Sequence, residues 1–153
     1  MSVPSRLPPF RRSLAGTLLA AREAALGPLR PVLHEAGITE QQWRVLRLLA
    51  DEGPSDPSRL AQEGLLHPPS VARILRDLTK SGLIVRKPDP VDGRRTIVAV
   101  TRQGSRLAEN IARRALKILE RYAKDFGKKR LAALLHDLTE LTRIIGETGP
   151  PRA

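Results

Sequence analysis

Apolar residues recur at helical spacing along most of this chain. A first run extends over residues 10–34, and Gly27-Pro28 interrupts it, so the pattern predicts a kinked helix or two shorter pieces. A second helix, predicted over residues 40–51, follows Thr39, and Gln42 stands three positions later, as in a capping box. The first third of the chain is therefore predicted to be helical.

Two shorter helices with a tight turn between them come next. The first is predicted over residues 58–62 and the turn over residues 64–67. The second begins at Pro68-Pro69, where a missing N–H costs nothing, and Gly82 ends it. This order is that of a helix-turn-helix, whose second helix lies in the DNA major groove. The predicted buried stripe of this second helix consists of Val71, Ile74, Leu75 and Leu78.

A basic β-hairpin is predicted over residues 84–100. Two runs of β-branched residues flank a tip rich in Pro and Asp, and Asp92-Gly93 is a strong turn signal. Arg94 and Arg95 come directly after this turn. Paired guanidinium groups at the tip of a ribbon gain nothing from the fold, so we expect them to bind an external anion. The DNA phosphate backbone is the commonest such anion.

Two long helices, over residues 102–126 and 128–145, are predicted to follow the hairpin, with Gly127 between them. A helix of about 25 residues is roughly 37 Å long, which is longer than a winged module can cover. Each helix carries a continuous apolar stripe, and buried apolar area is worth ~25 cal/mol/Å². The pattern therefore predicts a homodimer in which the first helix and these two helices intertwine. A helical bundle within one chain is the alternative.

The net charge of +11 changes this picture because the basic residues are concentrated. Residues 68–106 contain nine Lys and Arg and three Asp, a net charge of +6 in about a quarter of the chain. Such a concentration favours a basic face for nucleic acid, and a solvated charged surface is the alternative.

Several classes of protein are excluded or disfavoured by residues that are missing. The chain has no cysteine, so disulfides and Cys-ligated zinc are excluded. The three histidines lack metal-ligand spacing, and we expect no metal, no cofactor and a capping role for His67. There is no nucleophile elbow or phosphate-cradling loop, so an enzyme is disfavoured. No apolar run suits a signal peptide or a membrane span, so the expectation is a cytoplasmic protein without a membrane partner.

The motifs resemble those of the multiple-antibiotic-resistance regulator (MarR) family of winged helix-turn-helix repressors. Asp92-Gly93-Arg94-Arg95, followed by Val-Thr-Arg-Gln-Gly at residues 100–104, is similar to the family's Asp-x-Arg-Arg and Leu-Thr-x-x-Gly signature. Leu60-Ala61 and residues 71–78 also match, although Ala72 stands where the family more often has Thr. The resemblance covers residues 14–145. It implies a mainly α fold with a small β-wing (α+β) and an intertwined homodimer.

The resemblance also implies a division of the chain and a set of DNA contacts. Residues 1–36 would form an arm and a dimerisation helix, 37–101 the DNA-binding module, 102–146 the remaining dimerisation helices and 147–153 a disordered tail. Two such modules would bind a pseudo-palindromic operator in double-stranded DNA. The expected DNA-binding residues are Ser58, Pro69, Ser70, Arg73, Arg76, Lys80, Arg86, Asp92, Arg94 and Arg95.

Individual roles follow from this comparison. Ser70, Arg73 and Arg76 would work in the major groove, with a phosphate contact or a surface ion pair as the alternative for Arg76. Arg94 would reach a narrow minor groove, and Asp92 would brace the wing by pairing with one of the two arginines. Lys80 and Arg86 are expected to contact phosphate or solvent.

Family members are often released from DNA by a small phenolic or aromatic acid. Residues 39–47 and 65–75 are similar to those of regulators of hydroxyphenylacetate or homoprotocatechuate catabolism. An aromatic wall beside a guanidinium would suit such a ligand. Trp43 is equally compatible with a core position, Arg22 with a pair to Glu23 or to an acid of a second chain, and His34 with a helix cap. The candidate ligand-binding residues are Arg22, His34, Trp43, Arg44 and Arg47.

The function predicted from the sequence is therefore a sequence-specific repressor of an aromatic-acid operon. Two alternatives remain open: an architectural DNA-binding protein, and a regulator or activator that responds to no ligand. The operator, the regulated genes and the effector do not follow from the sequence.

Overall fold

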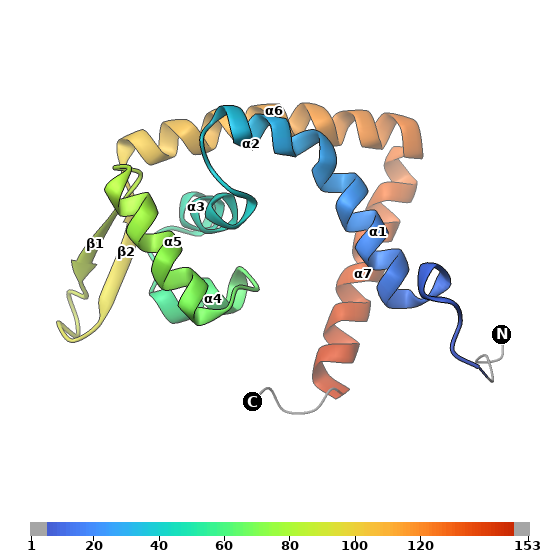
Figure 1. Cartoon of the computed structure of the whole chain (residues 1–153), viewed down its shortest axis with the longest axis horizontal. Helices are drawn as coiled ribbons and strands as arrows, with labels where there is room; N and C mark the ends of the chain where they lie inside the picture. Colours follow the sequence, from blue (N-terminus) through green and yellow to red (C-terminus); the bar gives the residue numbers. More distant parts are fainter. Residues whose placement is uncertain (1–5, 149–153) are drawn as a thin grey trace. The chain divides into compact units, whose positions relative to one another are not determined.

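The computed structural model describes residues 6–148, and the helices and strands lie close to their predicted positions (Figure 1). The chain divides into two compact units, residues 1–114 and 115–153, and each is described here by itself. The elements are two 3-10 turns, η1 (Phe10–Arg12) and η2 (Gly27–Leu29), seven helices, α1 (Leu14–Leu26), α2 (Arg30–Glu35), α3 (Glu40–Glu52), α4 (Pro57–Glu63), α5 (Pro68–Lys80), α6 (Arg102–Phe126) and α7 (Lys128–Thr148), and two strands, β1 (Ile84–Pro88) and β2 (Thr96–Val100).

The first apolar run breaks at the predicted place. The 3-10 turn η2 contains Gly27-Pro28 and separates α1 from α2. Proline lacks the N–H that an α-helix needs at that position, so the helix cannot continue through it unchanged. The second helix, α3, is also confirmed: Thr39 Oγ1 accepts from Gln42 N at 3.1 Å, and Gln42 Oε1 accepts from Thr39 N at 2.9 Å. Both halves of the capping box are present.

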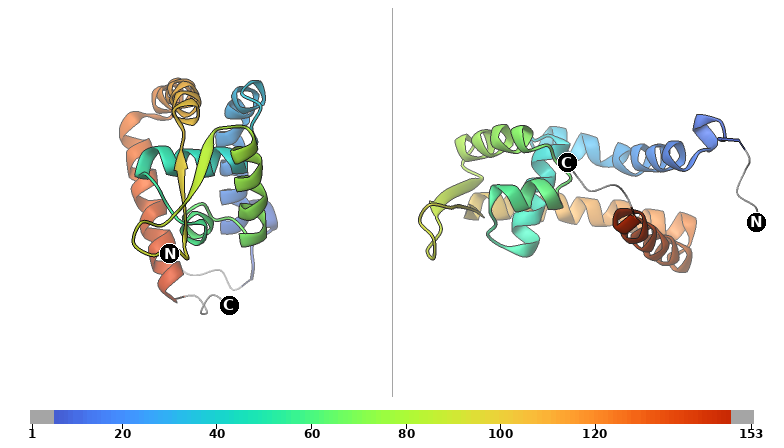
Figure 2. Two further views of the ribbon diagram at one scale, coloured as in Figure 1. Left: turned by 90° about the vertical axis from the view of Figure 1, so that its left-hand side faces the viewer. Right: turned by 90° about the horizontal axis from the view of Figure 1, so that it is seen from below.

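The core of the first unit lies among α3, α4, α5 and the start of α6, and the hairpin packs beside α5 (Figure 2). All four residues of the predicted α5 stripe are buried, as are Leu60 and Ala61 of α4. In α3 the buried residues are Trp43, Val45, Leu46 and Leu49. This shared core fixes the position of α5 relative to the hairpin.

The wing has a component that the sequence did not reveal. β1 and β2 pair in antiparallel register, with Ile84 opposite Val100. Ser55 forms an isolated bridge to Val98, with N-to-O distances of 3.0 and 2.8 Å. The wing therefore has a one-residue third strand directly before Asp56, the N-cap of α4.

Three backbone segments meet where β2 enters α6. Thr101 N donates to Leu83 O at 3.0 Å, and Thr101 Oγ1 donates to Gly82 O at 2.7 Å. The same hydroxyl accepts from Gly104 N at 3.0 Å and so caps α6. The α6 backbone passes so close to this loop that a methyl group on Gly104 would overlap the carbonyl of Leu83 and lie 2.7 Å from Val100 Cγ2. The Thr-x-x-Gly pattern is thus explained by packing.

Apolar side chains are exposed on the helices that the sequence assigned to dimerisation. In the first unit Leu14 of α1 is 54% exposed, and Leu18 and Leu19 are also exposed. Within the second unit the same holds for side chains of α6 and α7, among them Leu119 and Leu135. Such faces are the surfaces that a second chain would cover. Among residues 6–148, no helix is both long and apolar enough to span a membrane.

One prediction about the C-terminus is wrong. The sequence predicted that the last helix ends at residue 145 and that a disordered tail begins at residue 147, but α7 continues through Gly146 to Thr148. An isolated glycine weakens a helix without ending it when no capping arrangement follows. The rest of the predicted tail, residues 149–153, and residues 1–5 of the predicted arm lie outside the described residues.

Replacing Gly104 with alanine should lower the free energy of unfolding by about 1–3 kcal/mol, because the new methyl group must displace backbone at Leu83. Urea unfolding followed by circular dichroism measures this loss. Gly146→Ala is the control: a Cβ there meets nothing within 4 Å, so the variant should be as stable as the parent or more so. A Gly104→Ala variant as stable as the parent would contradict the close approach.

Candidate nucleic-acid interface

Helix α5 presents one charged face and buries the other. Pro68 and Pro69 occupy its first positions, and Asp77 O accepts from Ser81 N near its end. His67 stands at the N-cap, but its side chain makes no cap hydrogen bond, so the predicted capping role is wrong. On the outer face Pro69, Arg73, Arg76 and Lys80 are exposed and Ser70 is half-buried. The predicted reading face is therefore accessible to a ligand.

The cations on this face are free to bind an external anion. In the part of the chain that the structure describes, Arg73, Arg76 and Lys80 form no ion pair. Arg59 of α4 contrasts with them, because its guanidinium lies 2.7 Å from Glu63 and 3.4 Å from Glu52. An arginine between two carboxylates contributes little positive potential outside the protein.

Helix α4 contributes its N-terminal turn to the same module. Asp56 Oδ1 accepts from Arg59 N at 3.0 Å, which caps the helix. Ser58 is exposed in the first turn, where backbone N–H groups point out of the helix. Both its hydroxyl and the helix end can donate to a phosphate oxygen.

Asp92 shapes the tip of the wing through the backbone. Its Oδ1 accepts from Arg94 N at 3.1 Å, and its carbonyl accepts from Arg95 N at 2.9 Å. Asp89 Oδ1 likewise accepts from Val91 N at 2.9 Å. The predicted ion pair between Asp92 and an arginine side chain is absent from residues 6–148, so that prediction is wrong. A carboxylate in a tight turn finds its nearest donors in the backbone two residues later.

The two arginines of the wing differ in their surroundings. Arg95 Nη2 lies 3.8 Å from Asp56 Oδ2, which ties the tip of the wing to the N-cap of α4. Arg94 is exposed and, within the described ranges, has no carboxylate partner. Arg86 is exposed on β1. The wing thus offers Arg94 and Arg86 to a ligand, while Arg95 also braces the module.

Arg22, the first of the candidate ligand-binding residues, belongs to a cluster of ion pairs. Arg22 pairs with Glu23 at 3.0 Å and with Glu40 at 3.3 Å. Arg30 joins the same two carboxylates, at 2.6 Å from Glu23 and 2.5 Å from Glu40. The hydrogen bond from Arg30 lowers the pKa of Glu40, and burial acts in the opposite direction. These four residues connect α1, α2 and the start of α3.

The other four candidates are not gathered into one pocket. Trp43 is 6% exposed and belongs to the core. Arg44 Nη1 donates to the carbonyl of Gly64 at 2.8 Å, so a ligand could take this guanidinium only by displacing that contact. Arg47 pairs with Asp51 at 3.2 Å, and both side chains are 62% exposed. His34 is exposed and caps no helix with its side chain in the described structure.

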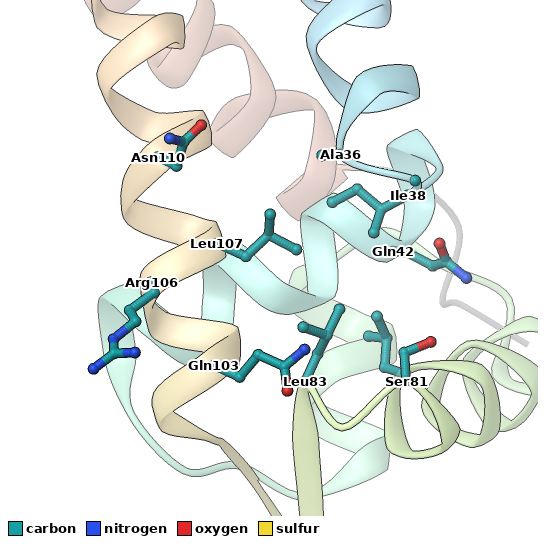
Figure 3. Close-up of a pocket in the computed structure, with 11 residues that line it drawn as sticks. Ala36, Ile38, Gln42, Ser81, Leu83, Gln103, Arg106, Leu107 and Asn110 are labelled. Carbon is teal, nitrogen blue, oxygen red and sulfur yellow. The ribbon is translucent and has the colours of Figure 1, made fainter.

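A different pocket of about 490 Å³ lies between the start of α3, the end of α5 and α6 (Figure 3). Leu107, Ile38 and Leu83 point into it, whereas the Arg106 guanidinium is directed away. None of the five sequence candidates lines it. No spacing pattern could have found it, because its residues are scattered along the chain: Ala36, Gly37, Ile38, Gln42, Leu78, Ser81, Leu83, Gln103, Arg106, Leu107 and Asn110.

The fold and the unpaired cations define a winged helix-turn-helix module with a basic face. The model of the MarR family matches residues 36–95. The chain is 37% identical over 127 residues to the transcriptional regulator FarR of Neisseria gonorrhoeae, covering 83% of this chain and 87% of that protein. It therefore belongs to the MarR family of transcriptional regulators, whose members bind DNA as dimers.

Two further similar proteins are connected with aromatic acids. The homoprotocatechuate degradative operon repressor of Escherichia coli is 31% identical over 128 residues, covering 84% of this chain and 86% of that protein. The crystal structure of NadR in complex with 4-hydroxyphenylacetate matches with a TM-score of 0.80 and 35% identity, over 94% of this chain and 99% of that one. The similarity to regulators of homoprotocatechuate catabolism that the sequence indicated is confirmed.

Glu40→Gln tests the ion pairs between α1 and α3. The folded pKa of Glu40 lies below the value of about 4.3 in an unfolded chain, so its ionised form stabilises the protein above that pH. The stabilisation is lost as the pH falls through the folded pKa. The variant should thus be less stable than the parent at pH 7, and the difference should shrink by pH 3 in urea unfolding. Glu120→Gln, which removes a carboxylate without an ion pair in the described part of the chain, should show no such difference. A pH-independent difference for Glu40→Gln would contradict this account.

Proposed function

We propose that this regulator represses an operon for aromatic-acid catabolism and that a small phenolic or aromatic carboxylate relieves the repression. The observation that carries the proposal is the exposure of unpaired guanidinium groups on two adjacent elements, Arg73 on α5 and Arg94 at the tip of the wing. A helix and a ribbon that both carry free arginines can bind two neighbouring grooves of one DNA duplex.

The roles of the individual residues follow from where they lie. Arg73 is in the N-terminal half of α5, where a reading helix meets base edges, and its guanidinium can donate two hydrogen bonds to guanine. Arg94 projects from the wing and suits a narrow minor groove, whose negative potential attracts guanidinium. Phosphate contacts are assigned to Lys80, exposed at the end of α5, and to Arg86, exposed on β1. Ser58, Pro69, Ser70 and Arg76 complete the proposed interface.

A twofold axis would place a second copy of this surface one DNA turn away. The exposed leucines of α1 and the apolar side chains of α6 and α7 support dimerisation through these helices. A symmetric dimer reads a pseudo-palindromic operator, because each protomer binds the same half-site.

The proposed effector class rests on two kinds of support. One is the similarity to the homoprotocatechuate operon repressor and to NadR in its complex with 4-hydroxyphenylacetate. The other is the exposed guanidinium of Arg47 on α3. The Arg47–Asp51 ion pair is solvent-exposed and therefore weak, so an aromatic carboxylate can compete with Asp51 for the guanidinium. The remaining candidates, Arg22, His34 and Arg44, stay predictions.

Replacing Arg73 and Arg94 together with alanine should abolish protection of a symmetric operator in a footprinting experiment and leave the dimer folded. Each missing contact should cost about 1–3 kcal/mol of operator affinity. Arg59→Ala is the control, because Glu52 and Glu63 already neutralise this arginine. Undiminished protection by the double variant would refute the proposed interface. Equal affinity of the parent for operator and random DNA at matched salt would favour an architectural DNA-binding protein instead.

Titration with 4-hydroxyphenylacetate should weaken operator binding about 5- to 150-fold, the usual range of allosteric coupling. Arg47→Gln should bind the operator as the parent does and lose this response. Arg121→Gln is a matched control, since Arg121 forms a similar exposed pair with Asp125. Fluorescence anisotropy of labelled operator measures both properties. The absence of any shift with phenylacetates and benzoates would contradict the effector class and leave the proposed operator contacts unaffected.

A further inference from the structure

The turn between α4 and α5 holds an unfavourable backbone conformation. Leu65 has a φ of +52°, and it is the only non-glycine residue with positive φ in the described chain. Left-handed backbone brings Cβ of an L-residue close to the following carbonyl, so this conformation has to be enforced by contacts. The side chain of Leu65 does not supply them, because the residue is 77% exposed.

Backbone hydrogen bonds hold only part of this turn. Gly64 N donates to Leu60 O at 2.9 Å and Leu66 N to Ala61 O at 2.9 Å, which attaches the turn to the end of α4. Among the described residues, the carbonyls of Gly64 and Leu65 accept no backbone hydrogen bond.

Arg44 of α3 supplies a donor to these two carbonyls. Its Nη1 donates to Gly64 O at 2.8 Å and lies 3.4 Å from Leu65 O. The side chain is half-buried and has no carboxylate partner among residues 6–148, unlike Arg47 one turn later, which pairs with Asp51. Nη1 of Arg44 is thus shared by two adjacent carbonyls of one turn.

The core holds the buried face of α5, but the N-terminus of the helix has no side-chain cap, so the turn before it helps to set where the helix begins. His67 offers no side-chain cap, and Pro68 and Pro69 have no N–H with which to form one. Arg73 stands less than two helical turns after this point, so a small rotation of the turn moves its guanidinium relative to the base edges.

We propose that Arg44 is a positioning residue for sequence recognition: it clamps the turn that precedes the reading helix and does not itself touch DNA. The clamp sets where the N-terminal half of α5 meets the bases. Arg44 thus affects the discrimination between operator and other sequences more than the attraction to phosphates. The inference rests on the operator-specific binding proposed above.

The test compares Arg44→Met, which keeps an apolar stem and removes the donors, with Arg44→Lys and the control Arg121→Met, which removes an arginine from an exposed ion pair on α6. Arg44→Met should bind the operator about tenfold more weakly, because a tenfold change in affinity is the size of effect expected from losing one hydrogen bond. Its affinity for random DNA and its salt dependence should match the parent, because no phosphate contact is lost. Arg44→Lys should recover much of the loss, since an ammonium can still donate to Gly64 O. Arg121→Met should behave as the parent.

Three results would overturn the inference. The first is parental operator affinity in Arg44→Met. The second is an equal loss on operator and random DNA with a smaller salt slope, which indicates a direct phosphate contact. The third concerns local structure: amide exchange at Leu65 and Leu66 should be faster in Arg44→Met, and parental exchange rates would exclude the clamp. If Arg44→Met does not fold, the same measurements are made on Arg44→Gln, whose side chain is shorter than that of arginine and should not reach the turn. A parent without operator preference would refute the proposed function instead.

Discussion

The close approach of the α6 backbone to Leu83 is the constraint on which the rest of the module depends. Only glycine at position 104 allows it, and the Thr101 hydroxyl joins the three segments that meet there. The end of α5, the base of the wing and the start of α6 are thereby fixed to one another through backbone atoms. The reading helix and the base of the wing share this joint, so the fold fixes their positions relative to one another.

The arginines of this protein divide into those that build the module and those that are left for a ligand. Arg59 is neutralised by two glutamates, Arg95 reaches Asp56, and Arg44 holds the turn before α5. Arg73 and Arg94 have no such contacts within the described structure. A high net charge therefore says little about where DNA binds, whereas the unpaired guanidinium groups of α5 and the wing are available to an external anion.

Much of the fold could be predicted because its signals are local. The capping box at Thr39, the break at Gly27-Pro28 and the α5 stripe each depend on residues within a few positions of one another. The sequence could not reveal the Ser55–Val98 bridge or the Arg44 contact, which join residues far apart in the chain. The prediction for Asp92 was wrong for a related reason. The nearby arginines suggested an ion pair, but the geometry of the turn brings the backbone N–H of Arg94 to the Asp92 carboxylate.

The candidate ligand site was the least predictable part, since a pocket requires several distant segments to converge. Residue type alone placed Trp43 and Arg44 together, yet one lies in the core and the other serves the helix-turn-helix. On α3 the guanidinium of Arg47 remains accessible, and its ion-pair partner is the exposed carboxylate of Asp51. Glu40, at the start of the same helix, forms the ion pairs that join α1 and α2 to α3. Exposed ion pairs exchange partners at little cost. A carboxylate that competed with Glu40 for the guanidinium groups of Arg22 and Arg30 would therefore act on the connection of α1 and α2 to α3.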